Sequence, residues 1–146
     1  MRFWDSSAVV PLVCAETSST TCRNWLRADP VMLVWALTAT EVASAVARKR
    51  RDGSLDRLRV ATAKRRLARL EAAWSEVTRW EAVRDRARRL LETHDLRAAD
   101  SLQLAAALVA TEERPAGVEF VTFDQRLAEA AEHESFRVMP AFGPGA

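Results

Sequence analysis

The chain has 146 residues, of which 49% are hydrophobic and 29% are charged, with a formal net charge of +2. This balance is typical of one globular domain and excludes a disordered or fibrous chain. No apolar run approaches the roughly 20 residues that cross a bilayer, and Asp5 interrupts the early apolar stretch that a signal peptide would need. We therefore expect a cytoplasmic protein without a membrane segment.

Strands and helices are predicted to alternate along the chain. An apolar run typical of a strand buried on both faces lies at 31–35, and further strands are predicted at 1–4, 75–80, 118–123 and 136–140. Helical spacing and capping residues predict helices at 6–13, 17–29, 38–51, 54–74, 81–94, 97–113 and 124–134. The helix 54–74 is expected to bury a stripe made of Leu55, Leu58, Ala61, Leu67 and Leu70. The alternation predicts an α/β sandwich around a mostly parallel sheet, with a single domain over 1–140 and a flexible tail at 141–146.

Acidic residues fall where the predicted strands end. Asp5 closes the first strand, Asp124 directly follows the fourth, and Glu41 lies in the first turn of the helix after the second. Because the carboxyl ends of parallel strands share one edge of the sheet, these side chains should gather there, with the strand before Asp5 in a central position. Asp100 lies near the start of a helix, on its apolar stripe, and an inward carboxylate needs a partner or a cation.

Each acid also has a simpler interpretation. Asp5 and Asp124 could be helix N-caps, Thr38 and Glu41 have capping-box spacing, and Asp100 would favour its helix dipole. Taken together, however, three or four negative charges at one edge destabilise the site unless a proton or a metal offsets them. An all-oxygen ligand set suits Mg²⁺ or Mn²⁺. Caps and metal ligands both stay open at this point.

The segments that carry the four acids resemble the motifs of a known family. They are FWDSSAVVPL, TATEVASAV, LRAADSLQLAAAL and FVTFDQRLAEAA. In this order they resemble the four acidic motifs of the PIN domain, and the chain length and helix-rich alternation resemble the VapC-type toxins of type II toxin–antitoxin systems. The resemblance covers nearly the whole chain. It says least about residues 50 to 95, the region that varies most within the family. It implies a PIN-like α/β/α sandwich with a mostly parallel central sheet of four to five strands.

The resemblance also implies a site, an activity and partners. The family's acids correspond to Asp5, Glu41, Asp100 and Asp124, and its supporting hydroxyls to Ser7 and Thr122. The implied activity is a Mg²⁺- or Mn²⁺-dependent endoribonuclease, in which one or two ions activate a water that cleaves RNA phosphodiester bonds. Its implied partners are an inhibitory VapB-type antitoxin and a second copy of the chain, forming a homodimer, and a heterotetramer or larger assembly with the antitoxin.

A strongly basic segment follows the second acidic motif. Between Arg48 and Arg69 there are ten Lys or Arg residues against two Asp residues. Such a run is either a solvated helical face or a surface for phosphates or an acidic partner. Its first residues, Arg48, Lys49, Arg50 and Arg51, are candidates for RNA binding.

Other classes fit the sequence less well. A phosphatase of the haloacid dehalogenase type needs an acid two residues after its first Asp, where this chain has Ser7. A phospho-receiver domain needs a late lysine, and none follows Lys64. The remaining alternative is a non-catalytic PIN-like module that binds RNA or a protein partner.

Overall fold

The computed structural model describes residues 1–140, so the predicted flexible tail at 141–146 lies outside the described residues. The strands are β1 (Arg2–Trp4), β2 (Met32–Trp35), β3 (Ser75–Val77), β4 (Glu119–Val121) and β5 (Arg137–Met139). The helices are α1 (Ser6–Val13), α2 (Ser19–Ala28), α3 (Thr38–Arg51), α4 (Arg57–Ala73), α5 (Trp80–Thr93), α6 (Ala98–Ala110) and α7 (Gln125–His133). Every predicted element is present, with its ends moved by at most three residues. None of these helices is long and apolar enough to cross a membrane.

The five strands form one sheet in the order β3-β2-β1-β4-β5, and every pair in it is parallel. β1 therefore lies in the middle, with Phe3 in register with Leu33 on one side and Phe120 on the other. This confirms the predicted central position of the strand before Asp5. All strands point the same way, so their carboxyl ends share one edge of the sheet.

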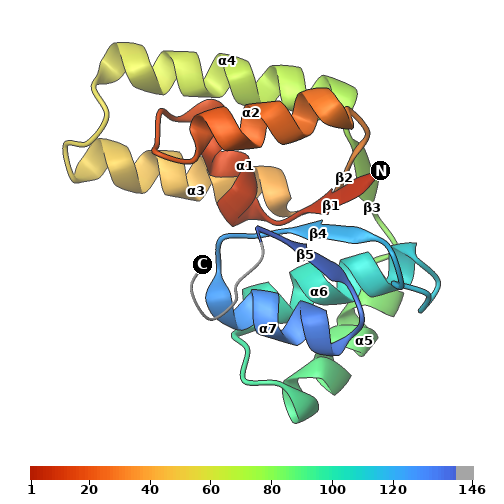
Figure 1. Cartoon of the computed structure of the whole chain (residues 1–146). Coiled ribbons are helices and arrows are strands. Elements are labelled where there is room, and N and C mark those ends of the chain that lie inside the picture. The colour runs from red at the N-terminus through yellow and green to blue at the C-terminus, as the bar shows by residue number, and fades with distance from the viewer. Residues whose placement is uncertain (141–146) are drawn as a thin grey trace.

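Helices cover both faces of the sheet, which gives the predicted α/β/α sandwich (Figure 1). Successive strand residues face opposite sides: Phe3 packs in the core with α5, α6 and α7, whereas Trp4 packs in the core with α1 to α4. Phe120 and Val121 of β4 divide between the two cores in the same way. The three inner strands β2, β1 and β4 are thus buried on both faces, which is why they read as continuous apolar runs.

One predicted core position in α4 was wrong. Leu58 is 79% exposed. The helix buries Val60 and Ala63, which were not predicted, together with Leu67. Leu58 precedes Val60 by two residues, a rotation of about 200° around a helix of 3.6 residues per turn, so it points away from the core. Leu67 is buried as predicted.

Candidate active site

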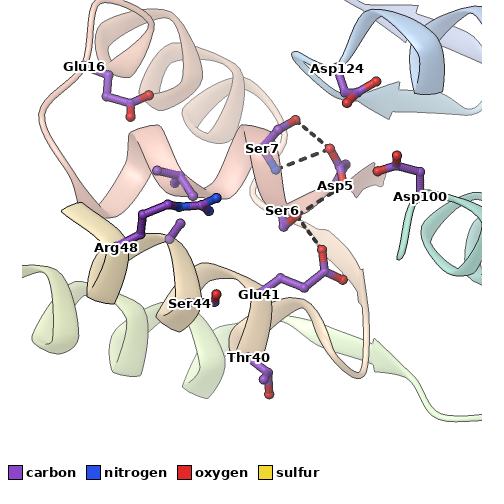
Figure 2. A pocket seen from close by; sticks show the side chains of 12 residues that line it. Asp5, Ser6, Ser7, Glu16, Thr40, Glu41, Ser44, Arg48, Asp100 and Asp124 are labelled. Atoms are coloured by element: carbon purple, nitrogen blue, oxygen red, sulfur yellow. Dashed lines mark hydrogen bonds between the residues drawn. The ribbon is translucent and has the colours of Figure 1, made fainter. Parts of the chain in front are cut away.

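The four acidic side chains come together beyond the carboxyl ends of β1 and β4 (Figure 2). Asp5 and Asp124 follow these two neighbouring strands directly, while Glu41 and Asp100 lie in the first turns of α3 and α6. All four line one groove of about 580 Å³. The structure therefore brings together every acid that the motifs singled out.

Asp5 forms the floor of the groove and is only 3% exposed. Its Oδ2 accepts hydrogen bonds from the Ser7 hydroxyl (2.5 Å), the Thr122 hydroxyl (2.9 Å) and the Ser7 amide (3.3 Å). Its Oδ1 receives a single long contact from the Ser6 hydroxyl at 3.4 Å. Burial raises the pKa of the Asp5 carboxyl, and the hydrogen bonds from Ser7 and Thr122 offset part of that rise. One oxygen is thus fixed by the protein, and the other retains capacity for a ligand.

The two predicted hydroxyls join the loops that carry Asp5 and Asp124. Ser7 Oγ accepts a hydrogen bond from the Phe123 amide at 2.9 Å, and Thr122 Oγ1 accepts one from the Asp124 amide at 3.1 Å. Each hydroxyl donates to Asp5 at the same time. Ser7 and Thr122 therefore hold the β1–α1 junction against the β4–α7 junction. Both hydroxyls also support the Asp5 carboxylate, as predicted.

Asp5 and Asp124 also cap the helices that follow them. The Asp5 carboxylate accepts from the Ser7 amide at the start of α1, and Asp124 Oδ1 accepts from the Leu127 amide (2.9 Å) at the start of α7. The N-cap interpretation is therefore confirmed for both. It does not compete with a ligand role, because a carboxylate has about four lone-pair sites and capping takes only one.

Glu41 does not form a capping box with Thr38. The N-cap of α3 is Leu37, which has no side chain able to cap, and Thr38 is already the first helical residue. The Glu41 carboxylate instead accepts hydrogen bonds from Ser6 Oγ (2.8 Å) and Gln103 Nε2 (3.1 Å). Burial raises its pKa, and the negative charges of Asp5 and Asp100 raise it further against these two hydrogen bonds.

Asp100 completes the negative cluster. Burial raises its pKa, and the charges of Asp124 and Asp5 add to that rise, so that its pKa is about 6. Within residues 1–140, no Lys, Arg or His forms an ion pair with any of the four acids. Ionisation of the whole group is therefore unfavourable without a cation in the groove.

The donor chemistry fits a hard divalent cation that keeps part of its water shell. All the converging ligands are carboxylate oxygens, which suit Mg²⁺ and Mn²⁺ rather than softer metals. As the side chains stand, no three acidic, His or Cys side chains within the described range are close enough to enclose an ion by themselves. Proteins usually do not enclose Mg²⁺ completely: one or two carboxylates bind it, and several waters and substrate phosphates complete its coordination.

The four basic residues at the end of α3 point to different places. Arg48 lines the same groove as the acids (Figure 2), whereas Lys49 forms an ion pair with Glu16 at 2.9 Å. Arg50 and Arg51 line a separate, largely apolar groove of about 320 Å³ between α3 and α4. Of the four, Arg48 is the one placed to contact a molecule held at the acids.

Two residues of the site were not predicted from the sequence. Ser6 bridges Asp5 and Glu41, and Gln103 reaches Glu41 from α6. Gln103 is three residues after Asp100 and therefore on a nearby face of the same helix. A polar residue in the otherwise apolar run LQLAAAL was the available signal.

Comparisons with known proteins agree with this fold. The family model of the PIN domain matches residues 2–133. Ribonuclease VapC45 and Ribonuclease VapC49, from two strains of Mycobacterium tuberculosis, are each 31% identical over 139 residues, which cover 95% of this chain and 94% of theirs. The chain therefore belongs to the PIN domain family, in the group of the VapC ribonucleases, and the resemblance inferred from the four motifs is confirmed.

Solved structures show the same fold at lower sequence identity. PAE2754 from Pyrobaculum aerophilum superposes with a TM-score of 0.62 at 19% identity, covering 94% of this chain and 87% of its own. VapC20 of Mycobacterium tuberculosis, described as a toxin that cleaves the sarcin–ricin loop, has a TM-score of 0.61 at 22% identity, with 89% and 95% covered.

Proposed function

We propose that this chain is a Mg²⁺- or Mn²⁺-dependent endoribonuclease that acts as the toxin of a toxin–antitoxin pair. The observation that supports this most strongly is the buried Asp5 carboxylate, held by two hydroxyls on one oxygen and surrounded by three more acids that lack ion-pair partners within residues 1–140. The relatives of similar length are named ribonucleases, which supports RNA as the substrate.

The acids would hold the metal. Asp5 Oδ1 and the Asp100 carboxylate are the proposed direct ligands, with Asp124 next and Glu41 binding a second ion or acting through water. When bound, the ion would lower the pKa of a water and stabilise charge on the scissile phosphate. Four carboxylates carry four negative charges, which two divalent ions would balance and one would not.

The remaining groups in the groove would orient the RNA. Arg48 lies on the α3 wall of the groove, and a guanidinium there can pair in a bidentate way with a phosphate. Lys49, Arg50 and Arg51 are proposed to add only long-range attraction, because one is neutralised by Glu16 and two line the other groove. An open groove also favours unpaired RNA, whose bases and backbone can be splayed against it.

Membership of the VapC group supports the rest of the proposal. We propose that a VapB-type antitoxin inhibits the enzyme by covering the acidic groove, and that the chain forms a homodimer and a larger complex with that antitoxin. The single domain over residues 1–140 and the cytoplasmic location stay predictions. Size-exclusion chromatography with light scattering, on the chain alone and with the proposed VapB-type antitoxin, tests the assembly.

The activity is tested with purified protein and structured RNA, with Mg²⁺ and with EDTA. Metal-dependent cleavage is expected in the wild type and a loss of at least a hundredfold in Asp5→Asn and Asp100→Asn. Asp85→Asn is the matched control, because Asp85 is an exposed residue of α5 whose ion pair within residues 1–140 is with its neighbour Arg84. Metal-independent cleavage, or full activity in both site variants, would contradict the mechanism.

Calorimetry with Mn²⁺ separates the enzyme from the non-catalytic alternative. An enzyme of the proposed kind gives a binding heat that Asp100→Asn removes. A module that binds RNA or a partner through its basic segment gives no heat that depends on Asp100, and no cleavage.

A further inference from the structure

Gln103 is a fully buried polar residue of α6 whose amide group donates two hydrogen bonds to side chains of α3. Its Nε2 donates to Thr38 Oγ1 and to Glu41 Oε1, each at 3.1 Å. The orientation of the amide follows from its partners, because an ionised carboxylate can only accept hydrogen bonds. The nitrogen must therefore face Glu41.

The remaining oxygen of Gln103 is unfavourable for stability. Gln103 Oε1 is buried and has no hydrogen-bond partner among the residues that the structure describes. A buried acceptor without a partner costs free energy, whereas a methionine of nearly the same length would fill the same space with no polar atom. Packing alone therefore does not account for a glutamine at this position.

What the amide does achieve is to restrict Glu41. A glutamate has a long side chain, and fixing it in one conformation costs conformational entropy. Gln103 holds Oε1 while Ser6 holds Oε2 at 2.8 Å, and Ser6 also contacts Asp5. The two donors come from different helices, so together they fix the direction of the carboxylate toward Asp5.

We propose that Gln103 is a positioning residue, which holds Glu41 in its working orientation. Its effect on catalysis rests on the proposed ribonuclease activity, whereas the hydrogen bond to Glu41 does not. Groups that hydrogen-bond to a metal-binding carboxylate orient it, and their removal commonly changes metal affinity or activity tenfold to a hundredfold.

The first experiment is a double-mutant cycle on RNA cleavage. Gln103→Met is expected to lower kcat about tenfold to a hundredfold and to change KM less than twofold. In a Glu41→Gln background the same substitution is expected to cause no further loss. Leu104→Met, one residue along α6 and buried in the core with α5 and α7, is the matched control, with wild-type kcat expected. An unchanged kcat in Gln103→Met, or a full further loss in the Glu41→Gln background, would overturn the proposal.

The second experiment is independent of cleavage and needs no change at Gln103. In NMR spectra of the metal-free wild-type protein, a side-chain amide proton of Gln103 is expected to be shifted downfield and protected from exchange with solvent. Both properties should be lost in Glu41→Gln and kept in Glu92→Gln, a control at an exposed position on α5. If the wild-type protein shows this signature but cleaves no RNA, the proposed function is refuted while the contact between Gln103 and Glu41 stands. An amide proton that exchanges freely in the wild type would refute the positioning role.

Discussion

Asp100→Asn is expected to stabilise the protein at neutral pH when no divalent cation is present. Burial and the charges of Asp124 and Asp5 raise the pKa of Asp100 from 3.8 to about 6. The folded state therefore holds this proton more tightly than the unfolded state does. The resulting stability is complete below pH 3.8 and is lost progressively as the pH rises to about 6. Asparagine cannot ionise, so the variant avoids the loss.

The magnitude follows from the size of the pKa shift. For a fully buried group, a rise of the pKa from 3.8 to about 6 corresponds to about 3 kcal/mol. Asp100 is only half-buried, and solvent screening reduces the figure to about 1.5 kcal/mol. For a chain of 146 residues, with an unfolding entropy of about 2 cal/mol/K per residue, this shifts the melting temperature by about 5 °C.

The assay is thermal unfolding in EDTA at pH 7.5 and pH 4.5, followed by circular dichroism. Asp100→Asn is expected to melt about 5 °C above the wild type at pH 7.5, and the difference should fall to less than half at pH 4.5. Asp85→Asn should follow the wild type at both pH values. A variant that melts at or below the wild type at pH 7.5, or an equal difference at both pH values, would refute the reasoning. Mn²⁺ should then raise the melting temperature of the wild type and not that of Asp100→Asn.

Three further outcomes concern the surroundings of the acids and the core. Ser7→Ala removes hydrogen bonds to Asp5 and to a backbone amide, and urea unfolding should show a loss of about 2–3 kcal/mol; no loss would contradict the bridging role of the hydroxyl. Arg48→Ala is expected to raise KM for RNA and to flatten its salt dependence more than Arg51→Ala does; equal effects would argue against binding in the acidic groove. Leu67→Ala opens a cavity at a buried position and should cost about 2–4 kcal/mol, so a cost below about 1 kcal/mol would contradict the packing of α4.

The fold and the four acids were predictable because they depend on local patterns. Strands buried on both faces read as apolar runs, and a parallel sheet places their carboxyl ends at one edge. Asp5 and Asp124 therefore could be placed beside each other although they lie in distant parts of the sequence. Treating their capping role as an alternative to a site role was unnecessary, since the same carboxylates cap α1 and α7 and line the groove.

The contacts around Glu41 could not be predicted in the same way. Gln103 meets Glu41 across 62 positions of the chain, and no periodicity relates the rotation of α6 to that of α3. Spacing suggested a capping box at Thr38, but the helix begins at that residue, so its side chain was free to accept from Gln103. The predicted burial of Leu58 was wrong for a related reason. The packing of α4 on α1 and α3 selects which of two apolar stripes is buried.

The central place of β1 has a consequence for the order of events during synthesis. β1 is synthesised long before one of its two neighbours, β4, and Thr122 reaches Asp5 across 117 positions. A growing chain carries Asp5 and Glu41 long before Asp100 and Asp124 exist, and pairing of such distant segments is slow even in the finished chain. The proposed ribonuclease would therefore stay inert until the segment that carries β4 has been made. Its activity would begin only when β4 inserts beside β1.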